Sequence, residues 1–187
     1  MPVIVVANPK GGVGKTTLAT NLAGYLASRG HAVMLGDVDR QQSSKTWLAL
    51  RPAGLPKIAT WEVSRDEIVR PPKGTTHIVL DTPAGLHGRR LDEVMKLADK
   101  VLIPLQPGIF DIHATHTFIA DLLAHRRSDR VQAAVVGMRT REGTISSRLT
   151  SQLAIFGRPA GRSASHVFDD CWRSTSPSIT AWPREAR

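Results

Sequence analysis

A glycine-rich segment near the start of the chain constrains the fold more than any other feature. It lies between an apolar run at residues 3–7, which predicts a buried strand, and a helical pattern at residues 17–29. Its eight residues are Lys10, Gly11, Gly12, Val13, Gly14, Lys15, Thr16 and Thr17. Glycines in such a turn let successive backbone N–H groups point into one concavity, and the following helix start adds its positive dipole end. The segment therefore predicts a phosphate-binding loop on an α/β domain.

The same segment carries the residue types that a triphosphate and its metal require. Lys15 is expected to bridge the β- and γ-phosphates, and the Thr16 hydroxyl to coordinate Mg²⁺. Thr17 is expected to bond the α-phosphate. Pro9 stands where the usual motif begins with glycine, and an additional lysine, Lys10, follows it. A glycine-rich turn that binds nothing is the alternative, which the strand before it and the helix after it disfavour.

Buried strands and amphipathic helices alternate along the chain as far as residue 156. Apolar runs predict strands at residues 32–35, 57–63, 77–80, 101–105 and 131–138. Helical spacing predicts helices at residues 43–50, 91–98, 111–126 and 145–156, with Ile112, Thr115, Ile119, Leu122 and Leu123 facing inward. Strands that are apolar on both faces are typical of a parallel sheet covered on both sides. We therefore expect an α/β fold, a three-layer P-loop NTPase with a mostly parallel sheet flanked by helices.

The composition of the chain changes after residue 156. Every leucine lies before residue 157, and the residues that follow are rich in Ser, Arg and Pro. Such a segment cannot supply a further regular strand and helix to a core. We expect a nucleotide-binding domain at residues 1–156 and an atypical, disordered or poorly packed tail at residues 157–187. A truncated gene or a shifted reading frame at its 3′ end is one hypothesis for this tail.

Two of the apolar strands end in carboxylates. Asp37 and Asp39 follow the run at residues 32–35, and Asp81 follows the run at residues 77–80. Because ligands of parallel α/β sheets bind at the carboxyl ends of the strands, we expect these side chains beside the glycine-rich segment. Asp81 is expected to hold Mg²⁺ through water, since Mg²⁺ keeps several of its own waters. Without a phosphate-binding loop, capping of a strand-to-helix turn would be the simpler role for Asp37 and Asp39.

These motifs together resemble the ParA/MinD superfamily of P-loop ATPases. The early Lys10 is that superfamily's signature, known as a deviant Walker A motif. Residues 37–41 resemble its aspartate-x-aspartate-proline-glutamine segment, with Arg40 in place of proline. Residues 77–85 resemble Walker B and the switch that senses the γ-phosphate. Residues 98–112 are similar to the corresponding part of short ParA-type plasmid partition ATPases.

The resemblance implies an ATP-dependent homodimer with ATP and Mg²⁺ as cofactors. It implies that Lys10 reaches across the dimer to the nucleotide of the second copy, as a cation supplied in trans. It also implies that Asp39 positions the attacking water and that Asp37 supports the Mg²⁺ shell. The implied catalytic residues are Lys10, Lys15 and Asp39, and the implied metal residues are Thr16, Asp37 and Asp81.

The formal charge of +9 favours a polyanionic partner. The resemblance implies binding of nonspecific DNA through basic residues late in the domain. The candidates are Arg126, Arg127, Arg130, Arg139, Arg141 and Arg148. A solvated basic surface without a nucleic-acid role is the alternative. The sequence shows no transmembrane run and no amphipathic segment suited to a membrane surface, so we expect a cytoplasmic, nucleoid-associated protein with no membrane partner.

The sequence as a whole predicts a weak, Mg²⁺-dependent ATPase that switches between a monomer and a DNA-binding dimer. A ParB-like or other adaptor protein would stimulate hydrolysis, and the cargo would be a plasmid, a chromosome or a protein assembly. Two alternatives stay open. One is a nucleotide-binding regulatory module with little or no turnover, because of its abnormal C-terminus. The other is a metabolic P-loop enzyme, which Lys10 and the short chain disfavour.

Overall fold

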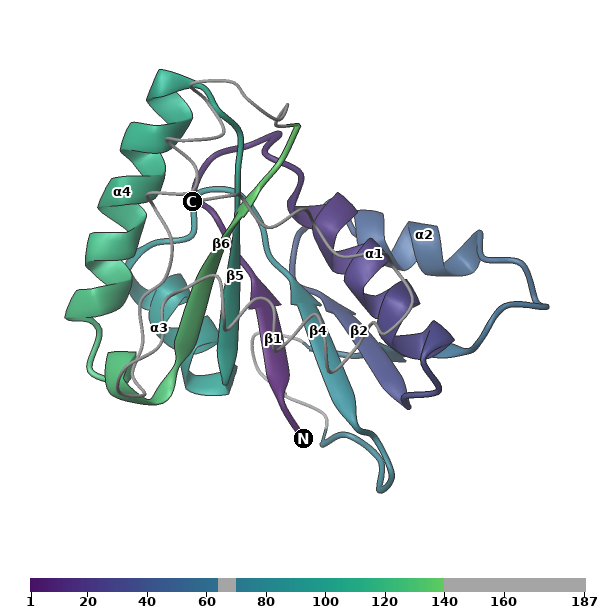
Figure 1. The fold of residues 1–187 in the computed structure, drawn as a ribbon. Coiled ribbons are helices and arrows are strands. Elements are labelled where there is room, and N and C mark those ends of the chain that lie inside the picture. The colour runs from purple at the N-terminus through teal and green to yellow at the C-terminus, as the bar shows by residue number, and fades with distance from the viewer. Residues whose placement is uncertain (64–69, 140–187) are drawn as a thin grey trace, which may run out of the picture.

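A six-stranded, wholly parallel sheet forms the centre of the molecule (Figure 1). The computed structural model describes residues 1–63 and 70–139. The strands are β1 (Val3–Val6), β2 (Val33–Asp37), β3 (Ile58–Trp61), β4 (His77–Asp81), β5 (Lys100–Leu105) and β6 (Gln132–Gly137). Their order across the sheet is β3-β2-β4-β1-β5-β6, so β4 and β1 lie at its centre. The predicted α/β fold with a parallel sheet is confirmed.

Helices cover both faces of this sheet (Figure 1). They are α1 (Lys15–Ser28), α2 (Ser43–Ala49), α3 (Gly88–Leu97) and α4 (Ile109–Ala124), followed by a short 3-10 turn at Ser128–Arg130. α1 and α2 pack on one face, and α3 and α4 pack on the other. This is the three-layer arrangement that the alternating sequence pattern predicts. Among the described helices, none is both long and apolar enough to cross a membrane.

β1 illustrates why the central strands are apolar along their whole length. Val3 and Val5 belong to the core under α3 and α4, whereas Ile4 and Val6 belong to the core under α1. All four side chains are buried. Successive residues of a strand point to opposite faces, and here both faces are covered. Polar side chains are therefore confined to the ends of these strands.

The predicted elements of the described region are present, with ends shifted by a few residues, but one predicted core residue is wrong. Leu123 on α4 is 46% exposed, whereas its neighbour Leu122 is buried. Adjacent positions on an α-helix lie about 100° apart, so only one of the two can point directly at the sheet. The predicted helix at residues 145–156 and the predicted tail at residues 157–187 lie outside the described residues.

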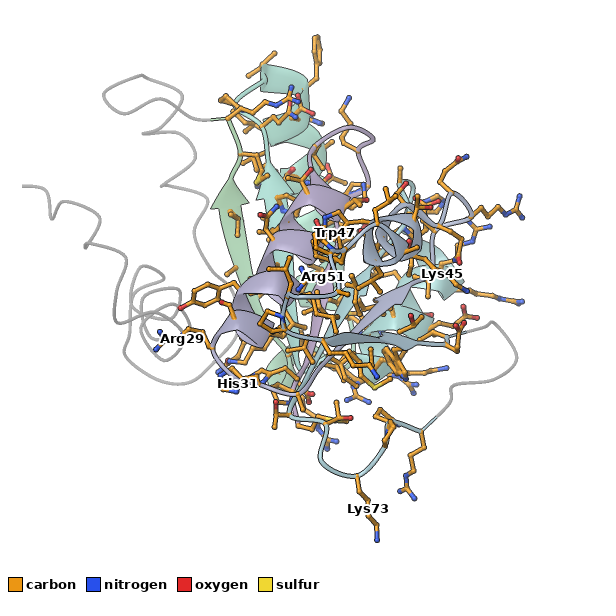
Figure 2. The ribbon with its side chains drawn as sticks, turned by 90° about the vertical axis from the view of Figure 1, so that its right-hand side faces the viewer. Arg29, His31, Lys45, Trp47, Arg51 and Lys73 are labelled. Carbon is orange, nitrogen blue, oxygen red and sulfur yellow. The ribbon has the colours of Figure 1, made fainter. Side chains whose placement is uncertain are left out.

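Aromatic packing holds the short helix α2 against α1. Figure 2 shows the Trp47 and Arg51 side chains close together, and the Arg51 guanidinium carbon lies 5.0 Å from the Trp47 ring centroid. A Cβ atom at Gly24 of α1 would lie 3.8 Å from both the ring and the guanidinium. The two helices therefore approach closely at this glycine, which fixes α2 beside the carboxyl end of β2.

We predict that Gly36 on β2 cannot accept a side chain without loss of stability. A Cβ atom there would lie 2.9 Å from Leu80 Cδ1 and 3.0 Å from Trp61 Cε3. Gly36→Ala should lower the free energy of unfolding by about 1–3 kcal/mol, the usual range for overpacking a core. The midpoint of urea unfolding, followed by circular dichroism, measures the change.

Gly54→Ala is the control for this prediction. Gly54 is exposed, and no heavy atom beyond its chain neighbours lies within 4 Å of a Cβ placed there. This variant should unfold at a midpoint close to that of the wild type. An equal loss of stability in both variants would contradict the packing account of Gly36.

Candidate functional site

The carboxyl ends of the central strands bring the glycine-rich loop and the strand-end carboxylates together. β1 leads directly into the loop at residues 9–14, and α1 starts at Lys15. In the parallel register, Val6 of β1 and Asp37 of β2 both pair with Asp81 of β4. The loop and the carboxylates therefore lie at one edge of the sheet, as the strand pattern indicates.

Two glycines of the loop adopt the left-handed backbone conformation that other residues disfavour. The φ angle is +73° at Gly12 and +98° at Gly14. Space at Gly14 is also limited, because a Cβ atom there would lie 2.9 Å from Cε of Met138, which follows β6. Val13 is buried and anchors the loop, whereas Gly11 and Gly12 are exposed. The exposed part of the loop leaves its backbone open to an approaching ligand.

The buried Asn8 side chain anchors the start of the loop. Its amide nitrogen donates hydrogen bonds to the Pro104 carbonyl and the Thr115 hydroxyl, both at 2.9 Å. Its Oδ1 accepts a hydrogen bond from the backbone N–H of Lys10, also at 2.9 Å. Asn8 thereby ties the loop to β5 and α4. This role was not predicted from the sequence, although a polar residue between a buried strand and a glycine-rich turn is a signal for it.

Two further hydrogen bonds hold the loop from neighbouring strand ends. The Gln106 side chain, which follows β5, donates from Nε2 to the Gly12 carbonyl at 2.8 Å. The backbone N–H of Gly85, which follows β4, donates to the Pro9 carbonyl at 2.8 Å. The loop is thus fixed from both neighbours of β1, and a ligand would meet a preformed conformation.

The two lysines of the loop have different surroundings. The Lys15 side chain is buried, and its ammonium donates a hydrogen bond to the Lys10 carbonyl at 2.7 Å. Burial lowers the pKa of Lys15, and the negative charges of Asp81 and Asp39 oppose that shift. The ammonium of Lys10 makes no hydrogen bond or ion pair with any residue in the described ranges. Lys15 is therefore held over the loop, whereas the Lys10 ammonium has no such partner among the described residues.

Asp37 caps the N-terminus of α2. Its Oδ2 accepts hydrogen bonds from the backbone N–H groups of Ser44 at 2.8 Å and Lys45 at 3.4 Å, and its Oδ1 accepts one from Asp39 at 3.0 Å. Burial raises the pKa of Asp37, and these three N–H groups oppose the shift. The capping role that the sequence left open is the one that Asp37 has here. Its predicted support of a metal stays a prediction.

Asp39 follows in the loop between β2 and α2. Its Oδ1 accepts a hydrogen bond from the backbone N–H of Gln41 at 3.1 Å, and its charge acts on Lys15. The side chain is only partly buried. Asp39 therefore lies near the Lys15 ammonium with access to solvent, and its predicted role toward a water molecule stays a prediction.

Asp81 is the most buried carboxylate of the site, with 1% of its surface exposed. Its Oδ2 accepts a hydrogen bond from the Ser44 hydroxyl at 2.6 Å. Its Oδ1 is also buried, and within the described part of the chain no hydrogen bond of good geometry reaches it. Burial raises the pKa of Asp81, whereas the Ser44 and Thr16 hydroxyls lower it. Ser44 was not among the site residues predicted from the sequence.

The surroundings of Asp81 fit a hard divalent cation. Mg²⁺ prefers carboxylate, hydroxyl and water oxygens, and it is commonly held by one or two carboxylates together with phosphate oxygens. Such donors are the buried Oδ1 of Asp81, without a well-formed hydrogen bond to any described residue, and the neighbouring Thr16 hydroxyl. A buried polar atom without a hydrogen bond lowers the stability of the fold. A cation or its bound water at Asp81 Oδ1 would remove this loss of stability.

Those predicted DNA-contact arginines that the structure describes lie in two groups. Arg126 and Arg130 are exposed in the turn before β6, whereas Arg139 is exposed just after β6. The length of β6 separates the two groups by roughly 20 Å, at about 3.3 Å per residue. Arg127 is partly buried in the same turn. Arg141 and Arg148 lie outside the described residues.

Comparison with known proteins gives a family match over most of the chain. A family model described as the CobQ/CobB/MinD/ParA nucleotide binding domain matches residues 4–156. A curated relative, the maintenance of carboxysome distribution protein A of Gloeobacter kilaueensis, is 38% identical over 112 residues, covering 59% of this chain and 51% of the relative. The chain spans about half the length of the first curated relatives it matches.

Solved structures share the fold at low sequence identity. The structure of pNOB8 ParA bound to nonspecific DNA has a TM-score of 0.60 and 18% identity, covering 81% of this chain and 73% of that chain. Cobyrinic acid a,c-diamide synthase from Mycobacterium smegmatis, with bound ATP analog and magnesium, has a TM-score of 0.56 and 21% identity. That match covers 80% of each chain. At these identities the comparison establishes a common fold.

We predict that Asn8 stabilises both the fold and the loop. Asn8→Ala would leave the Pro104 carbonyl and the Lys10 N–H without their partner, so the free energy of unfolding should fall by about 2–3 kcal/mol. Urea unfolding measures this loss. Asn21→Ala is the control, because Asn21 is exposed and, within the described ranges, its side chain bonds only the Thr17 carbonyl of its own helix. Comparable losses in the two variants would contradict the anchoring role.

We predict that Asp81 destabilises the ligand-free protein near neutral pH. Its pKa is raised by burial, so the protonated carboxyl is favoured in the fold, and stability is lost as the pH rises through the folded pKa. Asp81→Asn should therefore raise the unfolding temperature at pH 7 in EDTA, and the gain should shrink as the pH falls toward 4. Thermal unfolding across this range measures it, with the exposed Asp121→Asn as control. A lower unfolding temperature for Asp81→Asn at pH 7 would refute the prediction.

Proposed function

Because the chain belongs to the CobQ/CobB/MinD/ParA nucleotide-binding family, we propose that it binds ATP with Mg²⁺ and works as a ParA-type partition or positioning ATPase. The observation that carries this proposal is the buried Oδ1 of Asp81, which no hydrogen bond of good geometry reaches within the described part of the chain, close to the Thr16 hydroxyl and the preformed glycine-rich loop. A buried carboxylate oxygen without a hydrogen bond costs stability, and a glycine-rich turn that binds no ligand would not explain that cost.

The loop supports binding of the triphosphate. Backbone N–H groups of the loop, at Gly11, Gly12, Val13 and Gly14, and the start of α1 would receive the phosphate oxygens. The Lys15 ammonium would exchange its hydrogen bond with the Lys10 carbonyl for β- and γ-phosphate oxygens. Its burial makes such a charged contact strong, because few water molecules screen it. The exposed Thr17 at the start of α1 would bond the α-phosphate.

The strand-end residues support hydrolysis. Thr16 and Asp81 would hold Mg²⁺, which when bound neutralises charge on the β- and γ-phosphates. Asp39 would orient the attacking water, since it lies near Lys15 and keeps access to solvent. Asp37 would act on the metal shell indirectly, because its oxygens already cap α2. We expect turnover to be weak until an adaptor protein, ParB-like or other, stimulates it.

Dimerisation across the nucleotide edge is supported by a cation and an apolar pair. Lys10 is available at the loop, and it would reach the nucleotide bound to a second copy. Ile109 and Phe110, at the start of α4, are 71% and 78% exposed. They follow the Gln106 contact to the loop, so they lie on the same edge of the sheet. Two adjacent large apolar side chains at such an edge are suited to burial against a second copy.

Nonspecific DNA is the partner that the charge supports. The chain carries +9, and exposed arginines lie at both ends of β6. A protein that neutralises DNA phosphates loses affinity steeply with salt, so binding should be strongest at low ionic strength. Such a protein would be cytoplasmic and associated with the nucleoid. Its cargo would be a plasmid, a chromosome or a protein assembly.

We predict that sedimentation velocity with ATP and Mg²⁺ separates these roles. Asp39→Ala should form a long-lived dimer because hydrolysis is blocked, and the dimer should bind duplex DNA at low salt. Lys15→Ala should weaken ATP binding by about tenfold to 100-fold and stay monomeric, since it loses a charge-assisted contact. Phe110→Ser should weaken the dimer without changing nucleotide affinity.

Asp121→Ala serves as the matched control, because Asp121 is an exposed carboxylate on α4. It should behave as the wild type in every assay. Nucleotide-dependent dimers without ATP turnover would favour the alternative of a regulatory module. A wild-type protein that stays monomeric with ATP and ignores DNA would overturn the partition proposal.

A further inference from the structure

Two adjacent serines at the start of α2 have opposite surroundings. Ser43 is exposed, whereas the Ser44 side chain is completely buried. The Ser44 hydroxyl donates its hydrogen bond to Oδ2 of Asp81 at 2.6 Å. A short bond between a hydroxyl and a carboxylate, both shielded from water, is among the stronger hydrogen bonds in proteins. Ser44 is therefore a neighbour of the proposed metal position, although it lies 37 residues from Asp81 in the chain.

The same residue also holds the second strand-end carboxylate. The backbone N–H of Ser44 donates to Oδ2 of Asp37 at 2.8 Å. One residue thus contacts the carboxylate at the end of β2 through its main chain and the carboxylate at the end of β4 through its side chain. The backbone N–H of Val38 also donates to the Asp81 carbonyl, at 3.1 Å, so the two strand ends are joined in register. This double contact fixes the place of the Ser44 hydroxyl.

The Ser44 hydroxyl contacts one of the two oxygens of the Asp81 carboxylate and thereby affects its orientation. It occupies Oδ2, and no hydrogen bond of good geometry reaches Oδ1 within the described residues, so Oδ1 is the oxygen left for a cation. Without Ser44, the carboxylate could turn about its Cβ–Cγ bond, and neither oxygen would be held toward the loop. We propose that Ser44 is a positioning residue, which fixes the Asp81 carboxylate for Mg²⁺ and joins α2 to the metal position. This inference rests on the proposed binding of nucleotide and Mg²⁺.

A positioning role and a merely structural role give different results. If Ser44 only fastens α2 to the sheet, its loss lowers stability and affects nucleotide binding equally with and without Mg²⁺. If it orients Asp81, its loss raises the Mg²⁺ concentration needed and leaves the metal-free affinity unchanged. Hydrogen bonds to metal-ligating carboxylates typically change metal affinity by about 10-fold to 100-fold when removed.

The test uses the full chain and a fluorescent ADP, so that neither hydrolysis nor ATP-dependent dimerisation contributes. Affinity is measured in EDTA and then across a Mg²⁺ titration, for wild type, Ser44→Ala and Ser43→Ala. In EDTA the three proteins should bind equally. With Mg²⁺, Ser44→Ala should need at least about tenfold more metal for the same affinity, and Ser43→Ala should match the wild type.

Two further variants keep the test decisive. Ser44→Cys, of similar size and with a weaker donor, replaces Ser44→Ala if that variant fails to fold, and it should shift the Mg²⁺ requirement in the same direction. In an Asp81→Asn background, Ser44→Ala should cause no additional shift, because the effect passes through that carboxylate.

The outcomes also separate this inference from the proposed function. An unchanged Mg²⁺ requirement in folded Ser44→Ala or Ser44→Cys, with normal binding in EDTA, overturns the positioning role alone. An additional shift in the Asp81→Asn background overturns it as well. A wild-type protein that binds no ADP under either condition overturns the proposed function and this inference with it.

Discussion

The site depends on one constraint: the central strands of the sheet are buried on both faces. Such strands carry apolar side chains along their length, so polar chemistry is confined to the ends of each strand and the adjoining loops. Asp81 follows three fully buried apolar residues of β4 and is itself 1% exposed. Both folding and ligand binding bear on this residue, because a buried carboxylate needs polar or charged partners that the apolar core cannot supply. The Ser44 hydroxyl satisfies one of its oxygens and leaves the other open.

Local patterns in the sequence were sufficient for the layers of the fold and for the members of the loop. Strand and helix periodicity, the loop at residues 10–17 and the carboxylates at strand ends are all properties of short segments, and they lie where the patterns indicate. The contacts that hold the loop were not accessible in this way. Asn8 bonds residues that are 96 and 107 positions away, and such pairs depend on the order of the strands across the sheet.

The described arginines and Leu123 show that closeness along the chain does not imply closeness in space. Residues 126–139 are close together in the sequence, but β6 runs through this segment, so its two ends lie at opposite ends of the strand. Neighbours in a strand-containing segment are therefore poor evidence for a surface cluster. Leu123 was expected in the core because it continues a helical stripe, yet Leu122 already occupies the position that faces the sheet. The Leu123 error comes from treating adjacent helix positions as if they faced the same way, whereas the arginine contacts to DNA stay a prediction.

The hydrogen bonds also assign different tasks to the carboxylates of β2 and β4. Asp37 accepts three backbone N–H groups, two of them from the first turn of α2, and releasing them would cost about 1–2 kcal/mol in lost capping. Asp81 accepts a short hydrogen bond from the Ser44 hydroxyl on one oxygen, and no hydrogen bond of comparable geometry reaches its other oxygen within the described chain. A cation entering the site would therefore meet less competition at Asp81 than at Asp37, whose two oxygens already accept three N–H groups. Asp37 serves the same site from a distance, because the helix that it caps carries the hydroxyl that orients Asp81.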